Sequence, residues 1–217
     1  TIYSLYSYSK FVYLCTGFGI VVIDLEREEI KDTYIIGNNG SQVAVLDIHI
    51  SDNFIYALTN NHIKYADINS PFLSDAAIWN QLATPLGANL SNLVSEIEDF
   101  YAFGSQNIVY KYSNNSWDTI INYPSENLRT FKVQDDHLVT CTDDFITIYN
   151  QNLDTLNFYY AYNAEPGITP NDIILKNGYC WVADESKGFR RIKNNFSASK
   201  SIVGYGGPFT NLSLIHI

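Results

Sequence analysis

A short pattern that returns five times along this 217-residue chain constrains its fold more than any other feature. In each copy an apolar stretch ends in a small residue, and a short turn then leads into a second apolar stretch. The five copies are Tyr13–Thr16, Tyr56–Thr59, Tyr101–Gly104, Val139–Thr142 and Cys180–Ala183. Their last residues lie 43, 45, 38 and 41 positions apart. Repeats of about 40–45 residues built on hairpins are typical of β-propellers, whose blades are four-stranded antiparallel sheets, whereas a sandwich has closer and less regular strand spacing.

The residues between the paired stretches predict tight hairpin turns. Two-residue turns are expected at Gly17-Phe18, Asn60-Asn61, Ser105-Gln106 and Asp143-Asp144, and a longer turn runs from Asp184 to Gly188. Glycine, asparagine and aspartate tolerate the positive φ that two-residue hairpin turns require. The stretch before each turn is apolar at most positions and does not alternate, so we expect both faces of that strand to be covered.

The remaining strands can be placed around these hairpins. The central hairpins are predicted near residues 11–24, 54–68, 100–112, 137–149 and 178–192, with inner strands over 43–50, 127–133 and 171–175 and outer strands over 30–36 and 156–162. Residues 70–99 read as irregular, with a short helical turn around 75–82. The sequence therefore predicts an all-β fold, an incomplete β-propeller of about five blades spanning residues 1–211. An open arc exposes sheet edges, so we expect the isolated chain to aggregate.

Both ends of the sequence indicate a piece of a longer protein. Methionine is absent, and Thr1 is not a natural start. The last six residues, Leu212–Ile217, match the in-frame translation of a sequencing adapter, although the same string resembles a strand such as Leu46–Ile50. We expect residues 212–217 not to be native, and we exclude them from functional reasoning.

Composition excludes several classes of function. The 13 basic and 23 acidic side chains give a net charge of −10, and an acidic surface repels the phosphates of nucleic acids. No apolar run approaches the ~20 residues of a membrane-spanning helix. An apolar share of 46% excludes a disordered chain, and an aromatic share of 15% favours strands.

The sequence predicts no catalytic, metal or cofactor site. Cys15, Cys141 and Cys180 lie in different repeats and are expected to be buried as small apolar side chains. His49, His62 and His137 lack the close spacing of metal ligands. The chain contains no HExxH, GxSxG or P-loop motif, and Gly17-Phe18-Gly19 reads as a hairpin turn. The six aspartates that could suggest a glycosidase or calcium site are interpreted as turn residues: Asp47, Asp135, Asp136, Asp143, Asp144 and Asp184.

One basic cluster interrupts the acidic sequence. Lys187, Arg190, Arg191 and Lys193 fall within seven residues of one another. The cluster can be a solvated blade edge, or it can bind an anion such as sulfate or a phosphorylated sugar. Ligand-binding residues are otherwise unknown from the sequence.

Several phrases of the sequence resemble one known family. They are Thr16–Asp24 followed by Glu29–Gly37, Ile55–Asn61 followed by Ala66–Pro71, and Gly206–Asn211. Together they resemble the N-terminal β-propeller of the PorZ family, over roughly residues 11–211. The resemblance implies a non-enzymatic component of the type IX secretion system of Bacteroidota, located at the outer-membrane surface.

The same resemblance implies partners and an architecture. The partners are the sortase PorU, PorV and PorQ in an attachment complex, and the implied role is delivery of anionic lipopolysaccharide to the sortase. The implied architecture is two propellers followed by a β-sandwich sorting domain. The family has no short catalytic or ligand-binding motif, so no site residue transfers to this chain.

Two other functions stay open at this level. The chain can be the periplasmic propeller of a hybrid two-component regulator that senses oligosaccharides, because phrases such as TGFGI recur in those propellers. It can also be a propeller-fold enzyme acting on carbohydrates, which would require carboxylates that converge at one mouth of the central channel.

Overall fold

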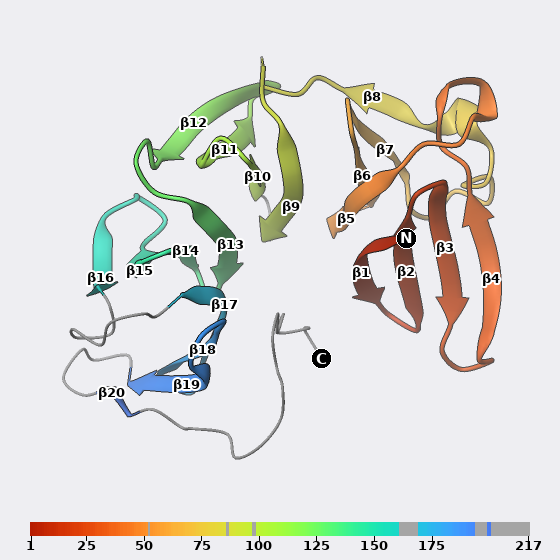
Figure 1. Cartoon of the computed structure of the whole chain (residues 1–217). Helices are drawn as coiled ribbons and strands as arrows, with labels where there is room; N and C mark the ends of the chain where they lie inside the picture. The colour runs from red at the N-terminus through yellow and green to blue at the C-terminus, as the bar shows by residue number, and fades with distance from the viewer. Residues whose placement is uncertain (52, 86, 97–98, 161–168, 194–198, 201–217) are drawn as a thin grey trace. The chain divides into compact units, whose positions relative to one another are not determined.

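The computed structural model of the chain describes residues 1–51, 53–85, 87–96, 99–160, 169–193 and 199–200. The described strands form five four-stranded antiparallel sheets, and the four strands of each sheet follow one another in the sequence (Figure 1). This result confirms the predicted all-β fold of propeller blades. The adapter-like residues 212–217 and the phrase at 206–211 lie outside the described residues.

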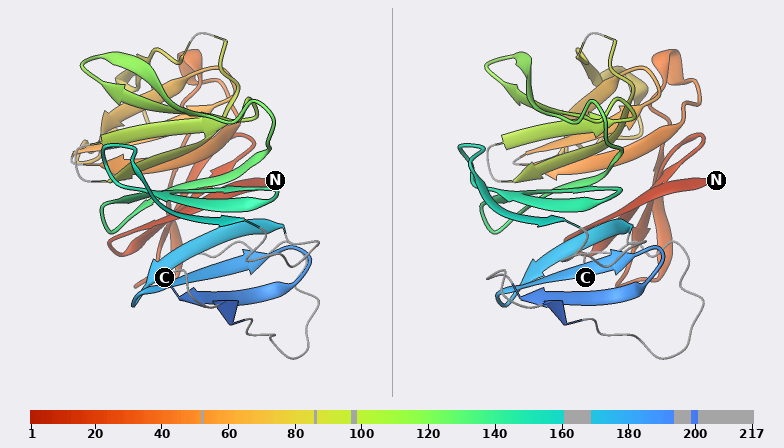
Figure 2. Two further views of the ribbon diagram at one scale, coloured as in Figure 1. Left: turned by 90° about the vertical axis from the view of Figure 1, so that its left-hand side faces the viewer. Right: turned by 60° about the vertical axis from the view of Figure 1, so that its left-hand side comes forward.

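We number the sheets blade 1 to blade 5 in chain order (Figures 1 and 2). Blade 1 contains β1 (Ile2–Tyr8), β2 (Phe11–Thr16), β3 (Gly19–Asp24) and β4 (Glu29–Tyr34). Blade 2 contains β5 (Val45–Ser51), β6 (Phe54–Thr59), β7 (Ile63–Asp67) and β8 (Asn80–Leu82). Blade 3 contains β9 (Leu90–Glu96), β10 (Asp99–Gly104), β11 (Ile108–Ser113) and β12 (Ser116–Asn122). Blade 4 contains β13 (Leu128–Gln134), β14 (His137–Thr142), β15 (Phe145–Tyr149) and β16 (Thr155–Tyr160). Blade 5 contains β17 (Pro170–Lys176), β18 (Tyr179–Asp184), β19 (Gly188–Lys193) and β20 (Ser199–Lys200).

The chain divides into two compact units, and each is described by itself. Unit 1 comprises Thr1–Thr119 and contains blades 1 and 2 and most of blade 3. Unit 2 comprises Ile120–Ile217 and contains blades 4 and 5.

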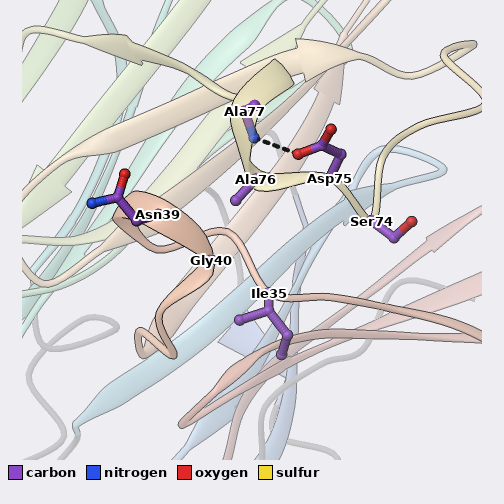
Figure 3. Close-up of a pocket in the computed structure, with 7 residues that line it drawn as sticks. All are labelled: Ile35, Asn39, Gly40, Ser74, Asp75, Ala76 and Ala77. Carbon is purple, nitrogen blue, oxygen red and sulfur yellow. Dashed lines mark hydrogen bonds between the residues drawn. The ribbon is translucent and has the colours of Figure 1, made fainter.

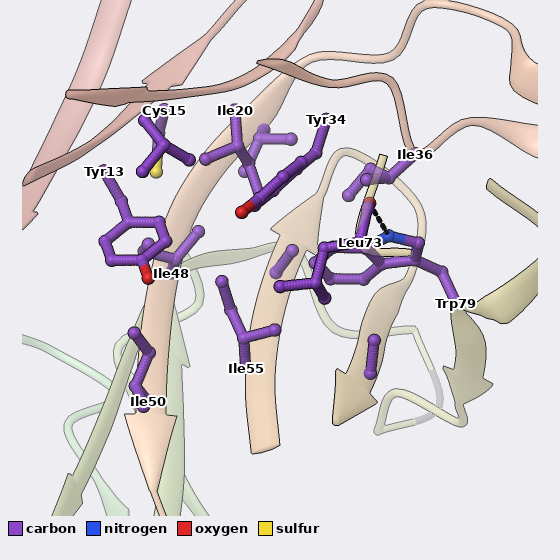
Figure 4. Close-up of a cluster of buried hydrophobic side chains, with 14 residues drawn as sticks. Tyr13, Cys15, Ile20, Tyr34, Ile36, Ile48, Ile50, Ile55, Leu73 and Trp79 are labelled. Carbon is purple, nitrogen blue, oxygen red and sulfur yellow. Dashed lines mark hydrogen bonds between the residues drawn. The ribbon is translucent and has the colours of Figure 1, made fainter. Parts of the chain in front are cut away.

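Apolar side chains fill the space between successive blades of each unit. In unit 1, Tyr13, Cys15 and Ile20 of blade 1 pack with Ile48 and Ile55 of blade 2, and the Trp79 indole donates a hydrogen bond to the Leu73 carbonyl at 2.9 Å beside them (Figure 4). On the other face of β6, Leu58 belongs to a second cluster with residues of blade 3. A strand covered on both faces does not alternate, which explains the continuous apolar pattern.

A β-bulge recurs at the same place in all five blades. The first strand pairs with the second in a register that shifts by one residue near its start, as between Val45 and Asp47 in blade 2. The extra residues are Tyr3, Leu46, Ser91, Arg129 and Asn171. The residue that follows each of them is polar, and we call these five the post-bulge residues: Ser4, Asp47, Asn92, Thr130 and Asp172.

The turns between the second and third strands close differently from the prediction. None of the residues in the predicted turns at 17–18, 60–61, 105–106 and 143–144 has a positive φ. The side chain before the turn closes it instead: the Thr59 hydroxyl donates to the His62 carbonyl at 2.8 Å and accepts from the His62 N–H at 3.1 Å. Thr142 bonds Phe145 in the same way, and the Thr16 hydroxyl donates to the Gly19 carbonyl and accepts from the Phe18 N–H. The left-handed conformation does occur at the end of two such turns, at Asn107 in blade 3 and at Gly188 of the predicted turn Asp184–Gly188 in blade 5. It also occurs in other hairpin turns, such as Asn114-Asn115 and Asp135-Asp136.

In blade 5 the residue that closes this turn is Asp184, one position after the predicted Ala183. Its Oδ1 accepts from the backbone N–H groups of Ser186 and Lys187 at 2.9 and 2.7 Å, and its Oδ2 accepts from the Thr169 N–H at 3.0 Å. With this correction, each post-bulge residue stands twelve positions before the residue that ends the second strand or closes its turn.

Blade 3 has glycine at this position because there is no room for a side chain. A Cβ built on Gly104 would lie 1.9 Å from the Asn89 carbonyl oxygen. The stretch 70–99 is also more ordered than predicted, since it holds β8 and β9 as well as the 3₁₀ turn η2 (Ala76–Ile78). The strand β8 is short and polar, so its sequence carries no hydrophobic pattern.

Candidate functional site

The post-bulge residue Asp47 links the first strands of three successive blades. Its Oδ1 accepts from the Ser4 hydroxyl of β1 at 2.8 Å and from its neighbour Ile48 N–H at 3.0 Å. Its Oδ2 accepts from the Leu93 N–H of β9 at 2.9 Å, and the Asn92 side chain is a further hydrogen-bond donor. Burial raises the pKa of Asp47 to about 6, although the four hydrogen bonds act in the opposite direction.

The equivalent residue of unit 2, Asp172, is paired with a cation. Lys132 of β13 brings its ammonium group to 2.6 Å from Asp172 Oδ1, and both side chains are largely buried. A second bond joins the same strands, because Gln134 Oε1 accepts from the Leu175 N–H at 2.7 Å. First strands are sheet edges, so these side chains satisfy edge groups and hold β13 and β17 together.

A partly exposed ion-pair network lies at the bulge of β13. The Arg129 guanidinium contacts Asp143 Oδ1 at 2.5 Å and Glu185 Oε2 at 2.9 Å. Asn127 donates to the other oxygen of Asp143 at 2.6 Å. Burial acts to raise the pKa of Asp143, but the bonds from Arg129 and Asn127 outweigh it and hold the pKa below its usual value. These groups therefore satisfy one another.

A pocket of about 420 Å³ lies in unit 1 between two 3₁₀ turns, η1 (Asn38–Gly40) and η2 (Figure 3). Its polar lining comes from Asn39, Ser74 and Asp75, and the Asp75 carboxylate accepts from the Ala77 N–H at 2.9 Å. Lys64 is buried beneath η1 and donates to the Asn38 side chain at 3.0 Å. The lining holds a carboxylate and no cation, so it does not suit an anionic ligand.

The basic cluster predicted from the sequence does not form one surface. Arg190 and Arg191 are neighbours on β19 and point to opposite faces of the sheet, and Arg190 is 6% exposed. The Arg191 guanidinium stacks over Tyr179 and Trp181, at 4.7 and 5.6 Å from the ring centres. The side chain of Lys193 lies outside the described residues. Neither the solvated edge nor a single anion-binding patch describes the two arginines.

The remaining predicted residues have structural surroundings. Cys15, Cys141 and Cys180 are free and buried, as expected, and burial raises the pKa of Cys15 to about 12 and of Cys180 to about 11. Within the part of the chain that the structure describes, no three His, Cys, Asp or Glu side chains gather to hold a metal ion. None of the helical segments described has the length and apolarity needed to cross a bilayer.

Sequence reasoning missed the post-bulge residues as a set. The sequence pattern singles out only Asp47 of the five, as a turn residue, and this interpretation is wrong because Asp47 lies inside β5. The signal was available in the constant twelve-residue distance between a polar residue and the end of the second strand.

Comparison with known proteins agrees with this description. A model of the PorZ N-terminal β-propeller domain of the type IX secretion system matches residues 1–80. The chain is similar to the structure of PorZ, "an essential bacterial surface component of the type-IX secretion system" of Porphyromonas gingivalis, with a TM-score of 0.72 and 19% identity. That match covers 97% of this chain and 27% of PorZ, so the chain spans about a quarter of its relative's length. The resemblance predicted from the sequence is thus confirmed.

Other structures share the fold alone. The computationally designed Ika8 protein has a TM-score of 0.68 at 12% identity, covering 99% of this chain and 65% of Ika8. The WD40 propeller domain of Doa1 has a TM-score of 0.64 at 15% identity, covering 91% of this chain and 66% of that chain. No curated protein sequence matches the chain.

Proposed function

We propose that this chain is the N-terminal propeller region of a PorZ-type surface component of a type IX secretion system, and that it binds and assembles without catalysing a reaction. The match of residues 1–80 to the PorZ propeller family carries the proposal. The fold likeness over 97% of the chain supports it. The chain spans 27% of PorZ, so we propose, by resemblance, that the longer protein has the activity of PorZ as a whole.

The polar groups of the chain support a structural module. Three largely buried acidic residues have structural roles: Asp47 links three first strands, Asp172 pairs with Lys132, and Asp184 closes a turn. A catalytic pair of carboxylates needs two acids that face a common substrate position. These three acids are instead occupied by protein hydrogen bonds and one ion pair.

We infer the partners from the same family. The longer protein works at the outer-membrane surface of a Bacteroidota cell with the sortase PorU, PorV and PorQ, and it delivers anionic lipopolysaccharide to the sortase. The chain has a net charge of −10, and two of its basic side chains are already paired within it: Arg129 with Asp143 and Glu185, and Lys132 with Asp172. We therefore assign glycolipid binding to the rest of the longer protein and protein–protein assembly to this region.

The test is a direct binding measurement with purified proteins. The 217-residue chain is immobilised and exposed in turn to PorU, PorV and PorQ from one Bacteroidota species, and the designed Ika8 propeller, which shares the fold, serves as the control. Saturable binding of at least one of the three to this chain and none to Ika8 is the expected result. Equal binding to both propellers, or binding to neither, contradicts the proposal. Binding of oligosaccharides instead would favour the sensor propeller.

A further inference from the structure

Asp47 and Asp172 occupy the same position of the repeat but differ in their neighbours. Both are post-bulge residues of a first strand. Asp172 receives the Lys132 ammonium group at 2.6 Å. Lys132 stands two residues after the post-bulge Thr130, and the corresponding position in blade 1 is Tyr6, two residues after Ser4. Tyrosine therefore replaces the lysine that would neutralise Asp47, and among the described residues no cation pairs with this carboxylate.

The hydrogen bonds around Asp47 allow it to take up a proton. A carboxylate offers about four acceptor positions, and Ser4, Ile48, Leu93 and Asn92 use them. A backbone or amide N–H can only donate, so three of these partners cannot accept a hydrogen bond from protonated Asp47. The Ser4 hydroxyl can rotate and accept. Protonation at Oδ1 therefore reverses the Ser4–Asp47 hydrogen bond and leaves Oδ2 free to accept from Leu93.

The geometry points to Asp47 as a proton-controlled link between the first strands of blades 1, 2 and 3, which holds unit 1 more tightly when it is protonated. The link joins β1 through Ser4 and β9 through Leu93, and both connections cross from one sheet to the next.

The other titratable groups near Asp47 do not change charge in the same pH range. On β1, burial raises the pKa of Tyr6 above its usual value, and on β2 it raises the pKa of Cys15 to about 12. On β5 itself, burial lowers the pKa of His49 to about 4, so its ring is neutral above pH 5. The residues of β6 and the described side chains of β9 are uncharged. Among these neighbouring groups, Asp47 is therefore the one whose charge is expected to change between pH 5 and 7.

The direction of the effect follows from the two states of the carboxyl group. Its pKa is about 6 in the folded chain and 3.8 in its ordinary state. The folded state therefore binds the proton more tightly. The contribution to stability is complete below about pH 4 and is lost as the pH rises through about 6.

The test measures this titration in the whole 217-residue chain. The ¹³Cγ shift of Asp47 is followed by NMR from pH 3 to 8, with Asp47→Asn identifying the signal. We expect the ¹³Cγ shift to titrate with a midpoint near pH 6. We also expect the urea concentration that half-unfolds the wild type to decrease as the pH is raised from 5 to 7.5, compared with Asp47→Asn. Tyr6→Lys supplies the cation found in unit 2 and should lower the midpoint of Asp47 by about one unit or more.

Two outcomes would overturn the inference. One is a midpoint below pH 4.5 in the wild type, which needs no variant to fold. The other is hydrogen-exchange protection of the Leu93 N–H that changes equally with pH in the wild type and in Asp47→Asn.

Discussion

A single hydroxyl group closes the same turn in three of the five blades. Thr16, Thr59 and Thr142 each bond the residue that begins or precedes the third strand, and each is buried. The bond fixes the path of the chain without a positive φ at either of the two turn residues, which leaves these two residues free to vary. The turns Gly17-Phe18, Asn60-Asn61 and Asp143-Asp144 can therefore differ in sequence although a threonine hydroxyl closes each of them.

Thr59→Val should therefore destabilise unit 1 although the two side chains have nearly the same shape. The His62 N–H loses its partner, and a loss of about 1 kcal/mol is expected for one such hydrogen bond. Urea unfolding followed by the fluorescence of the buried Trp79 measures the change. Thr59→Ser keeps the hydroxyl and should recover most of the loss. Equal loss in both variants would mean that the methyl group, not the hydrogen bond, matters.

Gly104→Ala should strongly destabilise the chain although it adds only one methyl group. The added Cβ would meet the Asn89 carbonyl at 1.9 Å, and the backbone on both sides of this contact belongs to the β9–β10 hairpin. We expect a loss of about 3 kcal/mol from this overpacking. Gly17→Ala is the matched control, because nothing lies within 4 Å of its Cβ, and it should change stability by less than about 0.5 kcal/mol. Similar thermal midpoints for the two variants would refute the close approach.

At the level of elements, blades are joined by side chains that reach between first strands. In unit 2 the pair Lys132–Asp172 joins β13 to β17, and Gln134 adds a bond to the Leu175 N–H. In unit 1 Asp47 joins β5 to β1 and β9 through hydrogen bonds with uncharged partners. The apolar clusters supply most of the burial, and these polar links fix which strand lies beside which.

Removing one partner of the Lys132–Asp172 ion pair should reduce the stability of unit 2 more than removing both charges. Lys132→Met leaves the buried Asp172 carboxylate without its cation and should destabilise unit 2 by about 3–5 kcal/mol. The double variant Lys132→Met with Asp172→Asn should be more stable than Lys132→Met alone. Urea unfolding monitored through Trp181 completes the double-mutant cycle. Additive losses from the two single changes would show that the groups act independently.

Some of the strands can be predicted from the sequence, and others cannot. The anchors of the repeat located the second and third strands because these strands are apolar on both faces. The strand β8 was not predicted, since Asn80–Leu82 has no apolar pattern and is defined by pairing with β7. The split of Arg190 and Arg191 follows from strand alternation and could have been foreseen once β19 was accepted. The three-blade contacts of Asp47 depend on tertiary packing, which no local pattern encodes.

At the scale of the whole molecule, charge limits what the chain can bind. The chain has 13 basic and 23 acidic side chains, and basic groups such as Arg129 and Lys132 are neutralised by contacts within their own unit. An anionic surface is repelled unless a local patch provides positive potential.

The isolated chain should therefore not bind anionic lipopolysaccharide vesicles at about 0.15 M salt, where charges act over roughly 8 Å. Co-sedimentation with vesicles, with bovine serum albumin as a negative control, measures this. Saturable binding that is lost in a Lys187→Gln, Arg191→Gln variant would contradict the expectation and return the glycolipid contact to this region.

The fixed distance between bulge and turn has a consequence for how such chains can change in length. From Ser4 to Thr16, and in each later blade, the interval stays at twelve residues, while the distance from one blade to the next varies. Insertions and deletions are therefore expected after the residue that closes this turn, as in the connection at residues 70–79 of blade 2. A loop grafted there would lengthen a connection within blade 2 and leave the hydrogen-bond register between its first and second strands untouched.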